Sequence, residues 1–352
     1  MTKPNSGTDM NIAPLDHQTV GDRLGANMCP TQSRATRAEV SKPPAKRRVA
    51  GARKTLRASK PSADKERSQK QDFSVCFWGA RGTLASNAED TARYGGNTAC
   101  VEVRLGKQSL ILDAGSGLRV LGDKIMKRAA KARKKGKAVP PIHLFFSHCH
   151  YDHISGLPFF APFFDPKAEV HLYSGHLEGP DKTKRMVTDY MAAPFFPVGP
   201  EVFSAKLAYH DFEPGDVLTP FEGVKLTTLS LDHHNGCVGY RVDFDGRSIC
   251  YITDTTHVPG KPDQGILNLI HGSELMIYDA TYTDEEFPQF WNFGHSTWEE
   301  GVRLAKAAGV KRYAIFHHRP SRCDDALDDI QAACRKVFPK SWAAREGQKI
   351  KV

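Results

Sequence analysis

Residues 148–153, which read His-Cys-His-Tyr-Asp-His, place three imidazoles and one carboxylate within six positions. Such a cluster is costly to bury unless a cation offsets the desolvation, and a divalent metal ion does so. Side chains alternate along an extended chain, so His148 and His150 point the same way and can bind one ion. Asp152 and His153 follow where the chain turns, and they can reach a second ion. These ligand types suit Zn²⁺, and they also accept Mn²⁺ or Fe²⁺.

Two adjacent ions convert a water into a hydroxide near neutral pH, and this bridging nucleophile attacks a carbonyl or a phosphorus. Asp152 can accept or relay the proton. A binuclear site needs more ligands than residues 148–153 supply. Three further polar residues each come just past a predicted strand: His233 after residues 224–231, Asp254 after residues 247–252 and His317 after residues 312–316. A second histidine stands beside two of them, so His234 and His318 are alternatives.

The elements that position these residues follow from apolar patterning. Residues 142–146 form an apolar, β-favouring run just before the metal cluster, which predicts a short buried strand. Further strands are predicted in residues 73–78, 99–105, 108–113, 224–231, 238–244, 247–252, 274–279 and 311–316, and helices in residues 117–135, 296–308 and 324–337. Ser-Thr-Trp-Glu at residues 296–299 matches a capping box. The order, in which strands are followed by helices twice, is typical of a layered α/β sandwich.

The basic charge of the chain is confined to its N-terminal part. Lys and Arg exceed Asp and Glu by nine within residues 1–70, which equals the net charge of +9 for all 352 residues. Residues 1–71 are rich in Pro, Ser, Ala, Lys and Arg without a sustained period, so we expect a disordered tail, followed by one folded domain in residues 72–352. The run Lys46, Arg47 and Arg48 could contact nucleic acid or an anionic membrane surface, although a solvated tail explains it as well.

Composition also bears on the location of the protein. Eight cysteines are scattered without a CxxC pair, which favours reduced thiols. No apolar run approaches the length of a membrane span, and the N-terminus lacks a signal-peptide core. We therefore expect a cytoplasmic protein without a membrane span. Two aromatic segments interrupted by prolines, residues 156–164 and 193–197, could line a substrate funnel, form a dimer contact or pack in the core.

The HxHxDH pattern of residues 148–153 resembles the signature of the metallo-β-lactamase superfamily of binuclear metallohydrolases. The resemblance covers nearly all of residues 72–352 and includes Phe-Trp-Gly at 77–79, Gly-Tyr-Arg at 239–241, Thr-Asp at 253–254 and Phe-His-His at 316–318. It implies a four-layer αββα sandwich with two divalent metal ions. By this resemblance, His148, His150 and His233 bind one ion; Asp152, His153 and His317 bind the other; Asp254 bridges them; and Asp113 supports a ligand without binding metal itself.

Within the superfamily, Gly-His-Ser-Thr at residues 294–297 resembles a loop of ribonuclease Z and its phosphodiesterase relatives. The resemblance implies that His295 is the acid in phosphodiester cleavage. Other branches differ in residue type. Flavodiiron oxidoreductases have Glu in place of His150, zinc β-lactamases commonly have Cys in place of Asp254, and glyoxalase II carries a GHTPGH segment that this sequence lacks.

Two departures from ribonuclease Z and its close relatives concern the substrate. Only 21 residues separate His233 from Asp254, an interval in which ribonuclease Z carries its tRNA-gripping arm. Arg319 stands where an Asp is expected after His318, and it adds a cation that could help to bind an anion or could simply face water. We therefore expect a cyclic nucleotide or another small phosphodiester as the substrate, and a homodimer, because phosphodiesterases of the superfamily are often dimers.

Three alternatives to this function stay open at the level of sequence. One is a ribonuclease in which the basic tail replaces the missing arm. Another is a lactone, ester or thioester hydrolase, in which the same hydroxide attacks a carbonyl and His295 matters little. The third is a binding protein with a structural metal site, against which the full ligand set argues.

Overall fold

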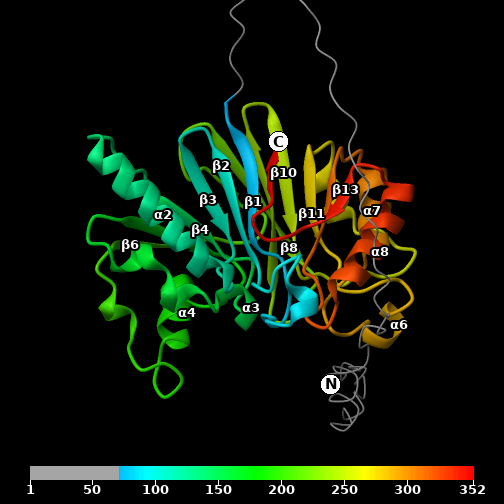
Figure 1. Cartoon of the computed structure of the whole chain (residues 1–352), viewed down its shortest axis with the longest axis horizontal. Helices are drawn as coiled ribbons and strands as arrows, with labels where there is room; N and C mark the ends of the chain where they lie inside the picture. The colour runs from blue at the N-terminus through cyan, green and yellow to red at the C-terminus, as the bar shows by residue number, and fades with distance from the viewer. Residues whose placement is uncertain (1–70) are drawn as a thin grey trace, which may run out of the picture.

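The structure, a computed structural model, describes residues 71–352, so the predicted tail lies outside the described residues apart from Gln71. Two seven-stranded sheets face each other (Figure 1). The first contains, in spatial order, β14 (Lys349–Lys351), β1 (Phe73–Gly79), β2 (Cys100–Leu105), β3 (Gln108–Leu112), β4 (Ile142–Phe145), β5 (Glu169–Ser174) and β6 (Lys206–Asp211). The second contains β13 (Ser341–Ala343), β12 (Tyr313–Phe316), β11 (Leu275–Asp279), β10 (Arg247–Ile252), β9 (Cys237–Phe244), β8 (Val224–Leu231) and β7 (Val217–Leu218).

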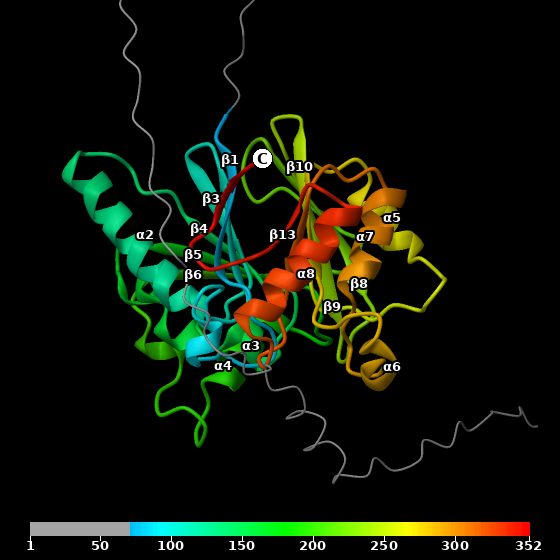
Figure 2. The same ribbon diagram turned by 45° about the vertical axis from the view of Figure 1, so that its right-hand side comes forward.

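Helices cover the outer face of each sheet (Figures 1 and 2). Those on the side of the first sheet are α2 (Gly117–Lys134), α3 (Tyr151–Ile154) and α4 (Lys182–Tyr190). Those on the side of the second are α5 (Gln264–Ile270), α6 (Phe287–Phe290), α7 (Trp298–Ala307) and α8 (Asp324–Val337). The predicted αββα sandwich is therefore confirmed.

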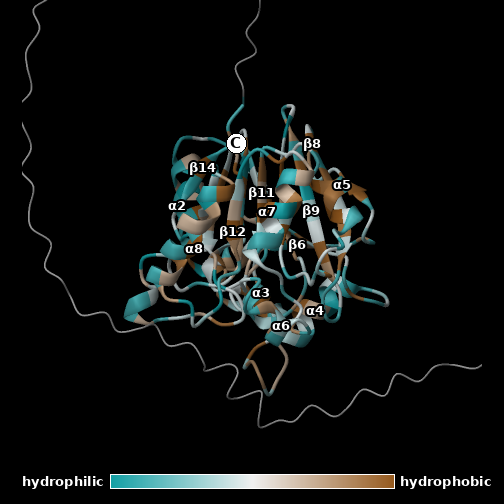
Figure 3. Ribbon diagram, turned by 90° about the vertical axis from the view of Figure 1, so that its right-hand side faces the viewer, coloured by the Kyte–Doolittle hydropathy of each residue, from teal (hydrophilic) through white to brown (hydrophobic). Residues whose placement is uncertain are grey.

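Three apolar clusters hold the four layers together. Figure 3 colours the ribbon by the hydropathy of each residue and shows hydrophobic segments in the strands of the second sheet, such as β12. Strand β4 shows how one strand serves two of them. Phe145 faces the cluster between the sheets, whereas Leu144 joins the cluster under α2, because successive side chains point to opposite faces. A strand that is buried on both faces reads as a continuous apolar run, which is the pattern of residues 142–146.

The N-terminus of α7 differs from the prediction by one residue. Thr297, not Ser296, is the N-cap residue, and its hydroxyl accepts a hydrogen bond from the backbone N of Glu300 over 3.0 Å. Both registers satisfy the Ser/Thr-x-x-Glu pattern, because two hydroxyl residues precede two glutamates. Ser296 instead contacts His257 Nδ1 at 2.8 Å and the Tyr278 hydroxyl at 2.9 Å.

The described residues bear on two general expectations. Six cysteines are free thiols, namely Cys76, Cys100, Cys149, Cys237, Cys250 and Cys334. Cys323 is disulfide-bonded, so the expectation of reduced thiols is wrong at that position. Within residues 71–352, no helix combines the length and the apolar character that crossing a bilayer requires.

Candidate metal centre

The candidate site lies at one edge of both sheets. β3 and β4 are parallel, and so are β10, β11 and β12, so the carboxyl ends of these strands meet at this edge. The residues that follow them there are Asp113 after β3, residues 147–153 after β4, Asp254 after β10 and His317 after β12, with Asp279 as the last residue of β11. His233 follows β8, which runs antiparallel to β9 and therefore in the direction of β10. Six strands thus deliver polar side chains to one place.

Three of these residues have left-handed backbone conformations. The φ angles are 62° for Asp113, 46° for Asp254 and 60° for His317. Residues other than glycine adopt this region rarely, and such conformations cluster at functional sites. Each of the three turns the chain directly after a strand, which aims its side chain at the shared edge.

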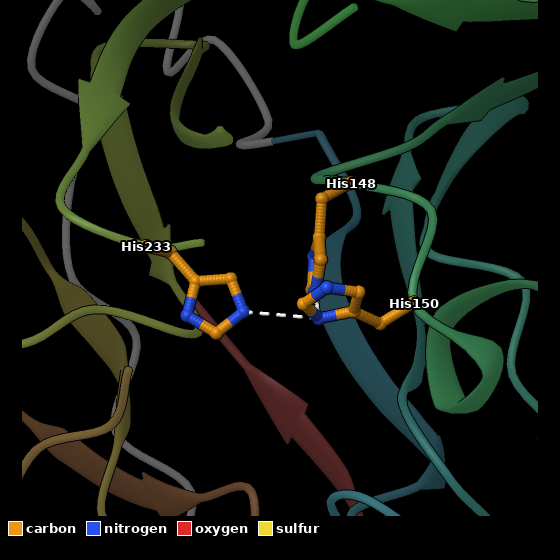
Figure 4. A group of neighbouring side chains, drawn as sticks. All are labelled: His148, His150 and His233. Atoms are coloured by element: carbon orange, nitrogen blue, oxygen red, sulfur yellow. Dashed lines mark hydrogen bonds between the residues drawn. The ribbon is translucent and has the colours of Figure 1, made fainter. Parts of the chain in front are cut away.

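Three imidazoles converge to form the first group, as Figure 4 shows. His148 Nε2 lies 3.0 Å from His150 Nδ1, and His233 Nε2 lies 3.1 Å from the same atom. Burial lowers the pKa of His148 well below its usual range and the pKa of His233 to about 4. Neutral imidazoles with available lone pairs are the form that a metal ion requires.

The second group consists of Asp152, His153, Asp254 and His317. His317 Nε2 lies 3.0 Å from Asp152 Oδ2 and 3.2 Å from His153 Nε2. Although burial lowers the pKa of His153, the carboxylates of Asp152 and Asp254 raise it well above the usual value. The carboxylates therefore create a negative potential that holds a proton here, and a divalent cation can take the place of that proton.

Asp254 joins the two groups through its two carboxylate oxygens. Oδ1 lies 3.3 Å from both His153 Nε2 and His317 Nε2. Oδ2 lies 3.6 Å from His148 Nε2 and 3.7 Å from His233 Nε2. One oxygen therefore faces each group, which is the arrangement that a bridging ligand needs.

The outward nitrogens of the imidazoles are held by neighbouring groups. His153 Nδ1 donates to Asp113 Oδ2 over 2.8 Å, and His233 Nδ1 donates to the Gly294 carbonyl over 2.7 Å. His317 Nδ1 lies 3.0 Å from the Thr281 hydroxyl. A Cβ at Gly294 would lie only 2.4 Å from His233 Nδ1, so this contact requires glycine. Partners of this kind fix the tautomer and the ring orientation of metal-binding histidines.

Asp113 is itself fully buried and, besides His153, is fixed by three donors. Its carboxylate accepts hydrogen bonds from the Ser147 backbone N over 2.6 Å, the Ser147 hydroxyl over 2.7 Å and the Tyr251 hydroxyl over 2.7 Å. It contacts His153 and no other imidazole of the two groups. This placement matches the supporting role that the resemblance implied.

His295 lies next to both groups and is paired with Asp279. His295 Nδ1 donates to Asp279 Oδ2 over 3.0 Å and lies 3.7 Å from Asp254 Oδ2. Burial lowers the pKa of His295, but the two carboxylates outweigh burial and raise this pKa to about 9. The two carboxylates therefore favour the imidazolium form, which can donate a proton. Asp254, Asp279, His295 and His317 also lie close enough to hold an ion, yet a protonated imidazole suits an acid better than a ligand.

The structure separates the two histidine doublets. His234 is exposed and its Nε2 contacts the Asn292 carbonyl at 2.8 Å, outside both groups. His318 is buried away from them, and its Nε2 donates to the Ala344 carbonyl over 2.7 Å. His233 and His317 are therefore the members of each pair that reach the centre.

Arg319 does not reach the candidate site. Its guanidinium lies over the ring of Phe290, 4.8 Å from the ring centroid, and within 4.0 Å of Glu286. A cavity of about 300 Å³ opens onto the metal groups, and it is lined by Thr83, Cys149, His150, Tyr151, Asp152, His233, His234, Asp254, Phe293 and His295. Arg319 is absent from this lining and is buried, so the described structure supports neither a direct contact with a bound anion nor a side chain that faces water.

Sequence reasoning missed Asp279, Thr281 and Thr83. Asp279 ends a buried strand just as Asp254 follows one, so the signal that found Asp254 could have found it. Thr281 supports His317, and the backbone N of Thr83 donates to Asp152 Oδ2 over 2.7 Å. No pattern marks Thr83, because its backbone makes the contact from 69 residues away.

The donor set fits two divalent metal ions. One group offers three neutral imidazole nitrogens, the other offers imidazoles and carboxylates, and one carboxylate faces both. His148, His150 and His233 would hold one ion, and Asp152, His153 and His317 the other, with Asp254 between them. Nitrogen-rich sets of this kind suit Zn²⁺.

Comparison with known proteins places these features in one family. Residues 109–318 match the family model described as the beta-lactamase superfamily domain. Ribonuclease Z of Haloferax volcanii is 23% identical over 260 residues, which cover 60% of this chain and 78% of that protein. The metallo-beta-lactamase fold protein YhfI from Bacillus subtilis superposes with a TM-score of 0.58 at 18% identity, over 80% of this chain and 100% of that one. Human tRNase Z, short form, superposes with a TM-score of 0.55 at 20% identity, over 79% of this chain and 100% of that one.

Proposed function

Because the chain belongs to the beta-lactamase superfamily, as its HxHxDH motif predicted, we propose that it is a metal-dependent hydrolase that cleaves phosphodiester bonds. The substrate class is a cyclic nucleotide or another small phosphodiester. The observation that carries the proposal is the position of His295, whose Nδ1 lies 3.0 Å from Asp279 Oδ2 and 3.7 Å from Asp254 Oδ2. An acid in this position is needed to release an alkoxide, which is the leaving group of a natural phosphodiester.

Two residues of the cavity lining, Asp152 and His295, have separate roles in proton transfer. When bound, two Zn²⁺ ions would supply a water of lowered pKa and positive charge to offset the charge that develops on the phosphoryl oxygens. Asp152, which is oriented by a hydrogen bond from the backbone N of Thr83, accepts or relays a proton from the attacking water. His295 donates a proton to the departing oxygen, and its charged form is stabilised by Asp279.

The interval between His233 and Asp254 supports a small substrate. β9 and β10 occupy nearly all of it and form an antiparallel hairpin around Asp245 and Gly246. No length is left for a projecting arm that could grip a folded RNA.

A ribonuclease is the second candidate function, and the Haloferax volcanii relative favours it. In that case the basic residues 1–70, which lie outside the described residues, would bind the RNA backbone. A lactone or thioester hydrolase is less well supported, because such a reaction gives no role to a protonated His295. A homodimer stays a prediction, which light scattering of the purified protein would test.

A panel assay of the metal-loaded protein tests the proposal. The substrates are bis-p-nitrophenyl phosphate, 3′,5′- and 2′,3′-cyclic nucleotides, a lactone and a thioester, each with wild type and with Asp152→Ala. We expect turnover of phosphodiesters that is lost in the variant. Turnover of the lactone or thioester alone would contradict the proposal.

A further inference from the structure

Two aromatic rings border the cavity that opens onto the metal groups. Tyr151 lines it beside His150 and Asp152, and Phe293 lines it two residues before His295. The side chain of Tyr151 is 77% exposed. A single exposed aromatic residue needs no explanation, but here the exposed Tyr151 and the half-buried Phe293 line one cavity, which indicates a surface that binds something.

The position of Tyr151 is fixed by its neighbours. It begins α3, directly after the N-cap residue His150, and its carbonyl accepts a hydrogen bond from the Ser155 backbone N over 2.8 Å. Because His150 and Asp152 on either side belong to the metal groups, the backbone cannot shift without moving both. The ring itself has little support: its nearest aromatic neighbour is Tyr190, with ring centroids 6.4 Å apart. The site therefore fixes the backbone of Tyr151 and leaves its ring free to contact a ligand.

Phe293 is held from behind by an aromatic stack. Its ring packs edge-on against Phe290 at a centroid distance of 5.5 Å, and Phe290 stacks on Tyr282 at 4.8 Å. The Arg319 guanidinium caps Phe290. Phe293 thus offers a fixed ring on the side of His295, and Tyr151 offers a second ring on the side of the HxHxDH motif.

Charge at the cavity restricts the substrate further. Among the described residues that line the cavity there is no Lys or Arg, whereas Asp152 and Asp254 are both present. Apart from its histidines, of which His295 is assigned the role of giving its proton to the leaving oxygen, the described lining has no cationic side chain that could balance a second charge on the substrate. A phosphomonoester or a polyphosphate is therefore disfavoured compared with a monoanionic diester whose substituents are uncharged.

We propose that Tyr151 and Phe293 form an aromatic subsite for the uncharged, planar group of a monoanionic phosphodiester, so that the preferred substrate carries a nucleobase. This inference rests on the proposed phosphodiesterase function and names its substrate class. Stacking of a base on an aromatic side chain contributes about 1–3 kcal/mol, as judged by alanine substitution. The lower half of that range corresponds to about tenfold in affinity.

Two substrates with the same leaving group test the proposal. Thymidine 5′-(p-nitrophenyl phosphate) and methyl p-nitrophenyl phosphate are both monoanionic diesters that release p-nitrophenolate, and only the first carries a base. We expect Tyr151→Ala to lower the ratio of their kcat/KM values about tenfold, and Tyr151→Phe to preserve it, because the ring and not the hydroxyl makes the contact. Phe159→Ala is the matched control: Phe159 is 56% exposed but does not line the cavity, so this variant should keep the wild-type ratio.

Two results would overturn the proposal: an unchanged ratio in Tyr151→Ala, or an equal loss on both substrates, which would indicate disturbed metal ligands. Equilibrium binding separates this inference from the proposed function. In calorimetry with metal-loaded protein, thymidine 5′-methylphosphonate should lose about tenfold in affinity in Tyr151→Ala, while dimethyl phosphate should not. That difference would support the subsite even if no phosphodiester were turned over, and its absence would refute the subsite even in an active phosphodiesterase.

Discussion

His295 Nδ1 lies 3.0 Å from Asp279 Oδ2, and this contact orients the imidazole that we propose as the proton donor of the site. Asp279 Oδ1 is in turn fixed by the Thr281 backbone N over 3.1 Å and the Thr281 hydroxyl over 2.8 Å. Thr281 also contacts His317. The acid and one metal-binding histidine therefore depend on the same short segment after β11.

Asp279→Asn should lower the pKa of His295. In the metal-free wild type, NMR titration should place this pKa near 9, because the paired carboxylates outweigh burial. In the variant it should move towards or below the usual value of about 6.5. Activity of the metal-loaded variant should then decline at a lower pH than in wild type. An unchanged NMR pKa would show that Asp279 does not hold the proton.

The same pair has a consequence for stability. Since the folded-state pKa of His295 lies above the unfolded value, its charged form stabilises the fold fully below about pH 6.5. That contribution should be lost as the pH rises through about 9. Denaturant unfolding of metal-free protein should show a loss of stability between these pH values that is smaller in Asp279→Asn.

The histidine doublets offer matched pairs for metal binding. His233→Ala and His317→Ala should each bind fewer than two ions per chain, because each removes an imidazole from a ligand group. His234→Ala should retain both ions, since its ring contacts the Asn292 carbonyl instead. Metal content after dialysis measures this. Full metal content in His233→Ala together with loss in His234→Ala would reverse the ligand assignment.

Asp113→Asn should weaken metal binding without removing a ligand. The carboxylate orients His153 over 2.8 Å, and loss of such a partner typically costs about 10- to 100-fold in metal affinity. Tyr251→Phe removes only one of the donors to Asp113 and should have a smaller effect. Competition with a chelator gives both affinities. Equal affinity in Asp113→Asn and wild type would exclude the supporting role.

Removal of residues 1–70 distinguishes a phosphodiesterase for small substrates from a ribonuclease that binds RNA through its tail. All of the candidate site residues lie within residues 71–352, so hydrolysis of bis-p-nitrophenyl phosphate should not change. If the protein is a ribonuclease that uses its basic tail, cleavage of RNA should depend steeply on salt concentration. In the truncated chain, both the rate of RNA cleavage and its dependence on salt should decline. RNA cleavage by the truncated chain at the full-length rate and with the full-length salt dependence would exclude a role for the tail.

The sequence predicted the strands that carry strong apolar patterning and the residues at their ends. Strands β5 and β6 were not predicted, because they mix His, Tyr, Lys and Asp with few aliphatic residues. β14 has the sequence Lys-Ile-Lys and owes its existence to antiparallel pairing with β1, which lies more than 270 residues away in the chain. Local pattern carries no information on such a contact.

The site was predictable where a motif or a strand end marked it, as at His148, Asp152 and Asp254. The sequence favoured His233 over His234 and His317 over His318, and the structure shows where each backbone aims its ring: His233 and His317 lie in the two groups, whereas His234 and His318 contact backbone carbonyls outside them. The pairing of Asp279 with His295 was not foreseen, since an acidic residue at the end of a buried strand carries no sign of its partner. The ligand roles themselves stay predictions until metal is measured.

The dependence of turnover on His295 tests the central claim most directly. The measurement compares wild type with His295→Ala, both metal-loaded, on a cyclic nucleotide, on bis-p-nitrophenyl phosphate and on a thioester. Loss of a general acid should cost about 10²- to 10⁴-fold in kcat on the cyclic nucleotide, which releases an alkoxide, and much less on bis-p-nitrophenyl phosphate, whose leaving group needs little protonation. Equal activity of both proteins on the cyclic nucleotide, or thioester hydrolysis without any phosphodiester turnover, would contradict the account.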